Sequence, residues 1–244
     1  MPLTHARPNL SVWIAASLIL AMALFGPILQ PANYHHFADA RSLFGIPNAG
    51  DVFSNLGFLL AGAYGLSTWL KTPHDTVART EYGVFFGALA LTAAGSTWYH
   101  LAPDDARLLW DRMPIALACA ALLAGELRRA FPLAAWTRSA LPVLLAFGAA
   151  SVFWWSFSGD LRPYLLIQAA PLLLIPALHW QIGAPMARRT AFVFAIVLYV
   201  LAKMFEVADT AAFDAFGIVS GHTVKHLLAV AAAFILVGQF RASA

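Results

Sequence analysis

Eight stretches of roughly 20 mostly apolar residues dominate this sequence, and each is long enough to cross a bilayer as one helix. They lie at about 11–28, 52–70, 82–100, 108–126, 139–157, 163–180, 190–208 and 218–239. The composition agrees, because 61% of the 244 residues are hydrophobic and 11% are charged. A soluble domain is about 45–50% apolar and about 25% charged. We therefore expect an all-α, polytopic membrane helix bundle.

The breaks between these stretches are short, and no repeat or long linker divides the chain. We expect an N-terminal unit at 1–50, made of one transmembrane helix and an external cap segment, followed by a seven-helix core at 51–244. The first helix could instead be a signal peptide cut near Ala21-Met22-Ala23. That cut would fall inside the apolar run, so an uncleaved span is favoured.

Charge and cysteine content limit the function classes. No basic run with interleaved aromatic residues is present, so a nucleic-acid partner is not expected. The one cysteine, Cys119, permits neither an intrachain disulfide nor a cysteine-type zinc site. With the N-terminus inside, nine of the 15 Lys and Arg residues fall on the cytoplasmic side and nine of the 12 acids fall outside. Since cytoplasmic loops are enriched in Lys and Arg, we expect both termini in the cytoplasm. The compact, nearly cysteine-free chain favours a bacterial inner membrane.

Polar residues with metal-binding and catalytic chemistry gather at the expected outward ends of three stretches. The last stretch opens with Gly221-His222-Thr223-Val224-Lys225-His226, which places two histidines four residues apart. Positions i and i+4 share one face of a helix, so both rings can reach one metal ion. His100 ends the third stretch with Ser96 one turn before it, and Asp111 opens the fourth. The expected topology brings all five groups to one membrane depth.

Three neutral imidazoles with one open position form the ligand set of a catalytic zinc site. We expect His100, His222 and His226 to bind Zn²⁺, which lowers the pKa of its water from about 15.7 to about 7. Ser96 can orient that water or donate to an oxyanion, and Asp111 can accept a proton or steer a ligand imidazole. His179 lies at the opposite end, and we interpret it as interfacial.

The set Ser96-x-x-x-His100, Asp111 and His222-x-x-x-His226 resembles the alkaline ceramidase family. This family belongs to a superfamily of seven-helix membrane hydrolases that also holds the adiponectin and progestin receptors. The segment Asp51-Val52-Phe53-Ser54-Asn55 is similar to the one that opens the first core helix of ceramidases. The resemblance covers residues about 51–240, most of the chain.

The resemblance implies that the three histidines bind zinc and that Ser96 and Asp111 assist hydrolysis of a lipid amide. The expected reaction converts ceramide and water into a sphingoid base and a fatty acid, at an active site facing the periplasm. The expected partners are the bilayer and a lipid amide drawn from it. An N-acyl amino lipid or an ester is an alternative substrate that the residues leave open.

Two departures from the family limit this reading. An extra helix precedes the seven-helix core. Eukaryotic ceramidases also bind calcium through an acidic N-terminal segment, whereas the segment 29–51 holds only Asp39 and Asp51 as acids. Calcium takes about six to eight oxygen ligands. Carbonyls and waters could complete such a shell, but we favour a segment without calcium.

Two other function classes stay open. A receptor-like or regulatory protein would keep the zinc site without robust turnover. A transporter or proton relay would use Lys203, Glu206 and Asp209, which we otherwise interpret as a self-neutralising cluster or a wall of the pocket. Asp51 is a reasonable N-cap for the second helix. Trp154 and Trp155 fit an aromatic belt at the membrane interface.

Overall fold

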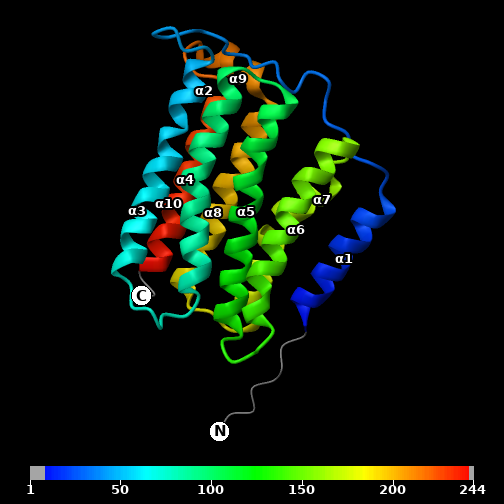
Figure 1. The fold of residues 1–244 in the computed structure, drawn as a ribbon, viewed down its shortest axis with the longest axis vertical. Coiled ribbons are helices and arrows are strands. Elements are labelled where there is room, and N and C mark those ends of the chain that lie inside the picture. The colour runs from blue at the N-terminus through cyan, green and yellow to red at the C-terminus, as the bar shows by residue number, and fades with distance from the viewer. Residues whose placement is uncertain (1–8, 242–244) are drawn as a thin grey trace.

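The computed structural model describes residues 9–241, and within that range the chain forms ten helices and no strand longer than an isolated bridge (Figure 1). The helices are α1 (Leu10–Leu24), α2 (Ala49–Ser54), α3 (Leu56–Lys71), α4 (Arg79–Leu101), α5 (Asp105–Ala130), α6 (Thr137–Ser158), α7 (Arg162–Gln181), α8 (Met186–Val207), α9 (Asp209–Phe216) and α10 (Gly221–Arg241).

Five helices in the described range, α5, α6, α7, α8 and α10, are long and apolar enough to cross a membrane. The expected all-α bundle with membrane-spanning helices is confirmed at this level. The helices do not match the eight expected stretches one for one. The second stretch is divided at Asn55, whose side-chain Nδ2 donates to the Asp51 carbonyl at 2.9 Å. A side chain that bonds to the backbone in this way competes with the helical hydrogen bonds.

The helices pack side by side, with α10 between α3 and α8, and with α4 against α5 (Figure 1). Helix α3 also packs against α4, and glycines allow this contact and the one between α4 and α5. A Cβ on Gly62 of α3 would lie 2.7 Å from the Ala90 nitrogen of α4, and one on Gly95 of α4 would lie 2.1 Å from the Trp110 carbonyl oxygen of α5. Backbones can approach this closely only where no side chain intervenes. Helix α1 lies outside this group and packs against α7.

Residues 25–48 cross the end of the bundle that carries α2 and α9 (Figure 1). The Ala38 nitrogen donates to Asp209 Oδ2 at 2.9 Å, and Asn48 Nδ2 donates to the His100 carbonyl at 2.8 Å. Within the segment, Asp39 forms a two-point ion pair with Arg41, and the hydrogen bonds from that guanidinium lower the pKa of the Asp39 carboxyl. The segment therefore contacts the helix ends through specific polar bonds.

The two adjacent tryptophans at the end of α6 have different environments. Trp154 is exposed, as an aromatic belt requires, but Trp155 is buried at 4% exposure. The belt interpretation of Trp155 is therefore wrong. Its ring centroid lies 3.9 Å from the Arg112 Cζ. The two tryptophans differ because neighbouring residues on a helix point about 100° apart.

Candidate metal centre

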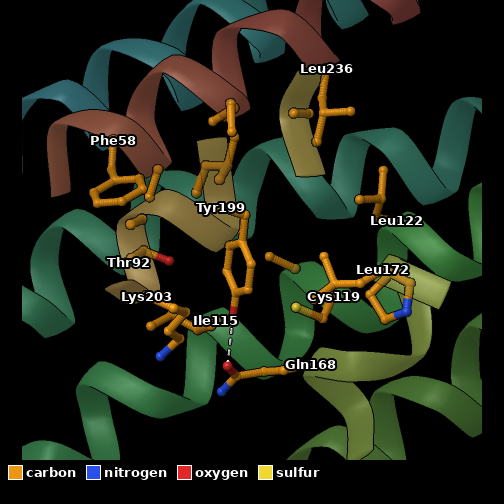
Figure 2. Close-up of a pocket in the computed structure, with 18 of the residues that line it drawn as sticks. Phe58, Thr92, Ile115, Cys119, Leu122, Gln168, Leu172, Tyr199, Lys203 and Leu236 are labelled. Carbon is orange, nitrogen blue, oxygen red and sulfur yellow. Dashed lines mark hydrogen bonds between the residues drawn. The ribbon is translucent and has the colours of Figure 1, made fainter. Parts of the chain in front are cut away.

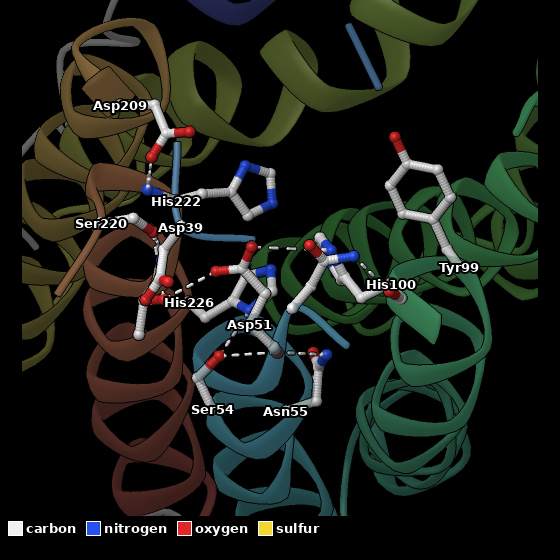
Figure 3. A network of polar contacts seen from close by, with 12 residues as sticks. Asp39, Asp51, Ser54, Asn55, Tyr99, His100, Asp209, Ser220, His222 and His226 are labelled. Atoms are coloured by element: carbon white, nitrogen blue, oxygen red, sulfur yellow. Dashed lines mark hydrogen bonds and ion pairs between the residues drawn. The ribbon is translucent and has the colours of Figure 1, made fainter. Parts of the chain in front are cut away.

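The three predicted histidines meet at one point inside the bundle (Figure 3). His100 comes from the last turn of α4, and His222 and His226 come from the first two turns of α10. Their ring centroids are 4.9 to 5.1 Å apart, and one nitrogen from each ring lies within 4.8 Å of the other two. All three side chains are at least 95% buried. The convergence on which the zinc prediction depends is present.

The start of α10 is fixed by contacts with α8 and α9. The His222 nitrogen donates to Asp209 Oδ1 at 2.7 Å, and the Thr223 nitrogen donates to Ser220 Oγ at 3.0 Å, which satisfies two amide groups that the helix leaves free. A Cβ on Gly221 would lie 2.3 Å from the Phe205 carbonyl oxygen. Only glycine fits there, and this close approach sets the position of the two histidines that follow.

A hydroxyl from α2 fixes the tautomer of His226. Ser54 Oγ lies 2.7 Å from His226 Nδ1 and 2.8 Å from the Asp51 carbonyl oxygen. When the Ser54 hydroxyl donates to this carbonyl, Nδ1–H of His226 donates to the Ser54 oxygen. The lone pair on Nε2 is then free for a metal. A partner on the far ring nitrogen is the usual arrangement around a metal-bound histidine.

His100 carries the clearest sign of a missing ligand. Neither of its ring nitrogens has a hydrogen-bond partner among residues 9–241, although the side chain is 99% buried. The nearest acid is Asp51, whose Oδ2 lies 3.8 Å from Nδ1 and also has no hydrogen-bond partner within that range. Leaving buried polar atoms unpaired costs about 1–3 kcal/mol each. A metal ion on His100 would remove that cost.

His222 has a different neighbour. Lys225 Nζ lies 2.9 Å from His222 Nε2 and 3.0 Å from Glu206 Oε1. The ammonium therefore has an alternative partner when that imidazole nitrogen is needed elsewhere. Three neutral imidazoles suit zinc or a similar divalent transition metal, whereas calcium prefers oxygen ligands. The donor set fits the predicted Zn²⁺.

The two predicted catalytic residues lie together beside this centre. Ser96 and Asp111 are 2% and 9% exposed, and their side chains interact across the interface between α4 and α5. Both line the same cavity as His226. The close approach of Gly95 to the Trp110 carbonyl brings the two helices near enough for this pair to form. A hydroxyl and a carboxylate thus share one buried space with an imidazole.

This cavity has a volume of about 220 Å³, and Figure 2 shows side chains from several helices pointing into it. Apolar side chains from six helices form most of its wall, including Phe58, Leu89, Leu122, Leu172 and Leu236. Near its polar end, the Tyr199 hydroxyl donates to Gln168 Oε1 at 2.7 Å (Figure 2). The space suits an elongated apolar group with a polar end at the histidines.

The suggested row of Lys203, Glu206 and Asp209 does not act as one cluster. Lys203 Nζ pairs with Glu206 Oε2 at 2.7 Å, and both residues line the cavity, so the wall interpretation holds for them. Asp209 instead accepts from the His222 and Ala38 nitrogens. The residue that joins Glu206 to the centre is Lys225, which the sequence pattern did not single out for this role.

Two expectations are wrong. Asp51 does not cap α2, because the cap residue is Asn48, and the Asp51 carboxylate is buried against Thr223 and His100. His179 is not interfacial, because it is 2% exposed and its Nε2 lies 2.8 Å from Glu126 Oε2. As expected, His179 is not among the three clustered histidines.

Asp39 and Asp51, the two acids considered for calcium, have separate partners, Arg41 and Thr223. Within residues 9–241 the three histidines are the one cluster with metal-ligand spacing. Compared with protein-family models and with curated proteins, the sequence has no match.

Proposed function

We propose that this chain is a zinc-dependent intramembrane hydrolase of lipid amides, of the alkaline ceramidase type. The observation that supports it best is the shared cavity: Ser96, Asp111 and His226 line one space whose walls are mostly apolar. A lipid amide has the same division, with a polar amide between long apolar chains. The residue pattern that resembles the ceramidases is the pattern that meets in space.

Each polar group has a defined part in the reaction. His100, His222 and His226 would hold the zinc ion, which when bound would supply Lewis acidity toward the amide carbonyl and toward water. The Ser96 hydroxyl donates to the carbonyl oxygen as negative charge develops on it. Asp111 accepts a proton from the attacking water and passes it to the departing nitrogen. The oxygen of water ends on the acyl carbon, the C–N bond breaks, and the products are an amine and a carboxylic acid.

The cavity accounts for substrate choice and for water exclusion. Its aliphatic and aromatic walls can take one acyl chain, and each buried methylene contributes about 0.8 kcal/mol. A chain seated there also displaces water from the space around Ser96 and Asp111, which strengthens their electrostatic interactions with the amide. Short amides would gain little of this energy and would be poor substrates.

The arrangement of the helix ends supports a topology. The first described residue of α1 and the last turn of α10 lie at the end of the bundle opposite the histidines (Figure 1). We place both termini in the cytoplasm and the site toward the periplasm of a bacterial inner membrane, with seven core helices and α1 as an additional span. Arg7, one of the basic residues that favours this orientation, lies outside the described residues.

Purified protein assayed with a long-chain ceramide in detergent tests the function. Wild type should release fatty acid over many turnovers, and Asp111→Asn should keep its metal while losing about 10²–10⁴-fold in rate. Asp214→Asn removes an exposed carboxylate on α9 that does not line the cavity, and it should remain active. Ceramide binding without turnover would favour the receptor-like alternative, and equal activity in wild type and Asp111→Asn would refute the proposal.

A further inference from the structure

A buried guanidinium next to the proposed catalytic aspartate lacks a carboxylate partner. Arg112 follows Asp111 on α5, is 3% exposed and lines the cavity. Its Nη2 donates to Gln30 Oε1 at 2.7 Å. Its Nη1 has no hydrogen-bond partner in the described part of the chain, and no carboxylate there lies within ion-pair distance.

Aromatic rings surround this guanidinium without neutralising it. Its Cζ lies 3.9 Å from the Trp155 ring centroid, 5.2 Å from that of Tyr34 and 5.3 Å from that of Tyr164. Cation–π contacts recover part of the hydration energy that a buried cation loses. They do not replace a counter-ion, because removing a charge from water is costly unless it is paired. The Nη1 group therefore remains a buried donor without an acceptor among the described residues.

The charged side chains that line the cavity also do not balance. The cations that line it are Arg112, Lys203 and Lys225, and the acids are Asp111 and Glu206. Glu206 pairs with both lysines. The cavity wall therefore carries one more positive than negative charge. The guanidinium is the cation without an ion pair within 4.0 Å among the described residues, although it interacts electrostatically with the neighbouring Asp111.

We infer that Arg112 forms a subsite for an anionic group on the head of the lipid, so that the preferred substrate is an N-acyl lipid whose head carries a carboxylate or an equivalent anion. The inference rests on the proposed function, because it assigns the head group of that same substrate. A guanidinium offers paired N–H donors whose geometry matches a carboxylate or phosphate. Arg112 would be a binding residue that sets specificity, while Asp111 beside it handles protons.

Binding to Asp111→Asn protein tests the subsite without turnover. The probes are N-palmitoylglycine, which has a free carboxylate, and its methyl ester, which differs only in lacking that charge. The acid should bind about tenfold or more tightly than the ester, since a charge-assisted hydrogen bond to a buried guanidinium is at stake. Palmitate carries its carboxylate at the position of the amide instead, and its affinity should depend on Arg112 less than that of the acylglycine.

A second substitution assigns the preference to one residue. Arg112→Gln in the same background should abolish the preference for the acid while ester binding shows that the protein is folded. Arg107→Gln is the matched control, because Arg107 lies on the same helix and over the Trp98 ring but does not line the cavity. The control should keep the preference.

The two proposals fail in different ways. Equal affinity for acid and ester in protein that still has Arg112 overturns the subsite, and cleavage of ceramide by wild type would leave the hydrolase standing. Equal dependence of palmitate and the acylglycine on Arg112 also overturns the head-group assignment. Acid preference without cleavage of any lipid amide would keep the subsite and remove the hydrolase.

Discussion

Gly95 lies at a close approach of α4 to α5, and replacing it with alanine should separate the Ser96–Asp111 pair. A Cβ at this position would be 2.1 Å from the Trp110 carbonyl oxygen, whereas contacts below 3.0 Å essentially never occur. The obstructing atom is backbone, so the helices must move apart by at least 0.9 Å, the difference between those two distances. Overpacking of this kind costs about 1–3 kcal/mol. The better helix propensity of alanine returns up to about 1 kcal/mol.

The loss of catalytic rate, expressed as a free energy, should exceed the loss in the free energy of unfolding. A displacement of about 1 Å between reacting groups can reduce a rate about 10²-fold. The metal ligands come from α4 and α10 rather than from α5, so Gly95→Ala protein should retain its zinc. We expect ceramide hydrolysis to fall about 10²-fold at unchanged metal content.

Gly87→Ala provides the matched control for this prediction. Gly87 also lies on α4, and a Cβ there would meet nothing within 4 Å. This variant should be as active as wild type and equally or slightly more stable. Activity at the wild-type level in folded Gly95→Ala protein would refute the idea that this contact positions the pair.

Three further predictions concern separate parts of the molecule. Glu126→Ala leaves the buried His179 and the partly buried Arg188 without their acidic partner, so unfolding in detergent should show a loss of about 3–5 kcal/mol. Ser54→Ala removes the group that fixes the His226 tautomer, and zinc competition with a chelator should show about 10–100-fold weaker binding. Hydrogen bonds from Arg162 lower the pKa of Asp160 to about 2, below the unfolded value of about 3.9. This contact therefore stabilises the fold above about pH 4 and is lost as the pH falls toward 2. The difference in unfolding temperature between wild type and Asp160→Asn should shrink over that range, and a constant difference would contradict the assignment.

The histidine cluster could be predicted because helix geometry and membrane depth together determine which of these histidines lie close to one another. Spacing of four residues puts His222 and His226 on one face, and the alternation of spans puts His100 at the same end. Ser96 and Asp111 were placed at this depth by the same reasoning, but the interaction between their side chains was not predicted. Positions along a membrane-spanning helix translate into depth, so a sequence alone can indicate which polar groups share a level.

The supporting residues could not be predicted in this way. Ser54 and Asp51 contact the histidines from α2, which ends at Ser54, and no periodic pattern signals the break at Asn55. The missing counter-ion of Arg112 is a property of tertiary packing, since it depends on which acids lie nearby.

The pairing of Glu126 with both His179 and Arg188 was not predicted from the sequence. These three residues lie near the expected cytoplasmic ends of their spans. The depth argument that located the metal centre therefore applied to them as well. An ion pair of Glu126 at that depth could have been predicted in the same way, whereas composition alone could not indicate it.

The metal content of the purified protein tests the central claim most directly. Elemental analysis of wild type should find about one zinc ion per chain, the number one three-histidine site can hold. His100→Ala and His226→Ala should each lose it, while Asp111→Asn should retain it. Zinc retained by both histidine variants, or multiple-turnover amide hydrolysis by protein shown to contain no metal, would contradict the account.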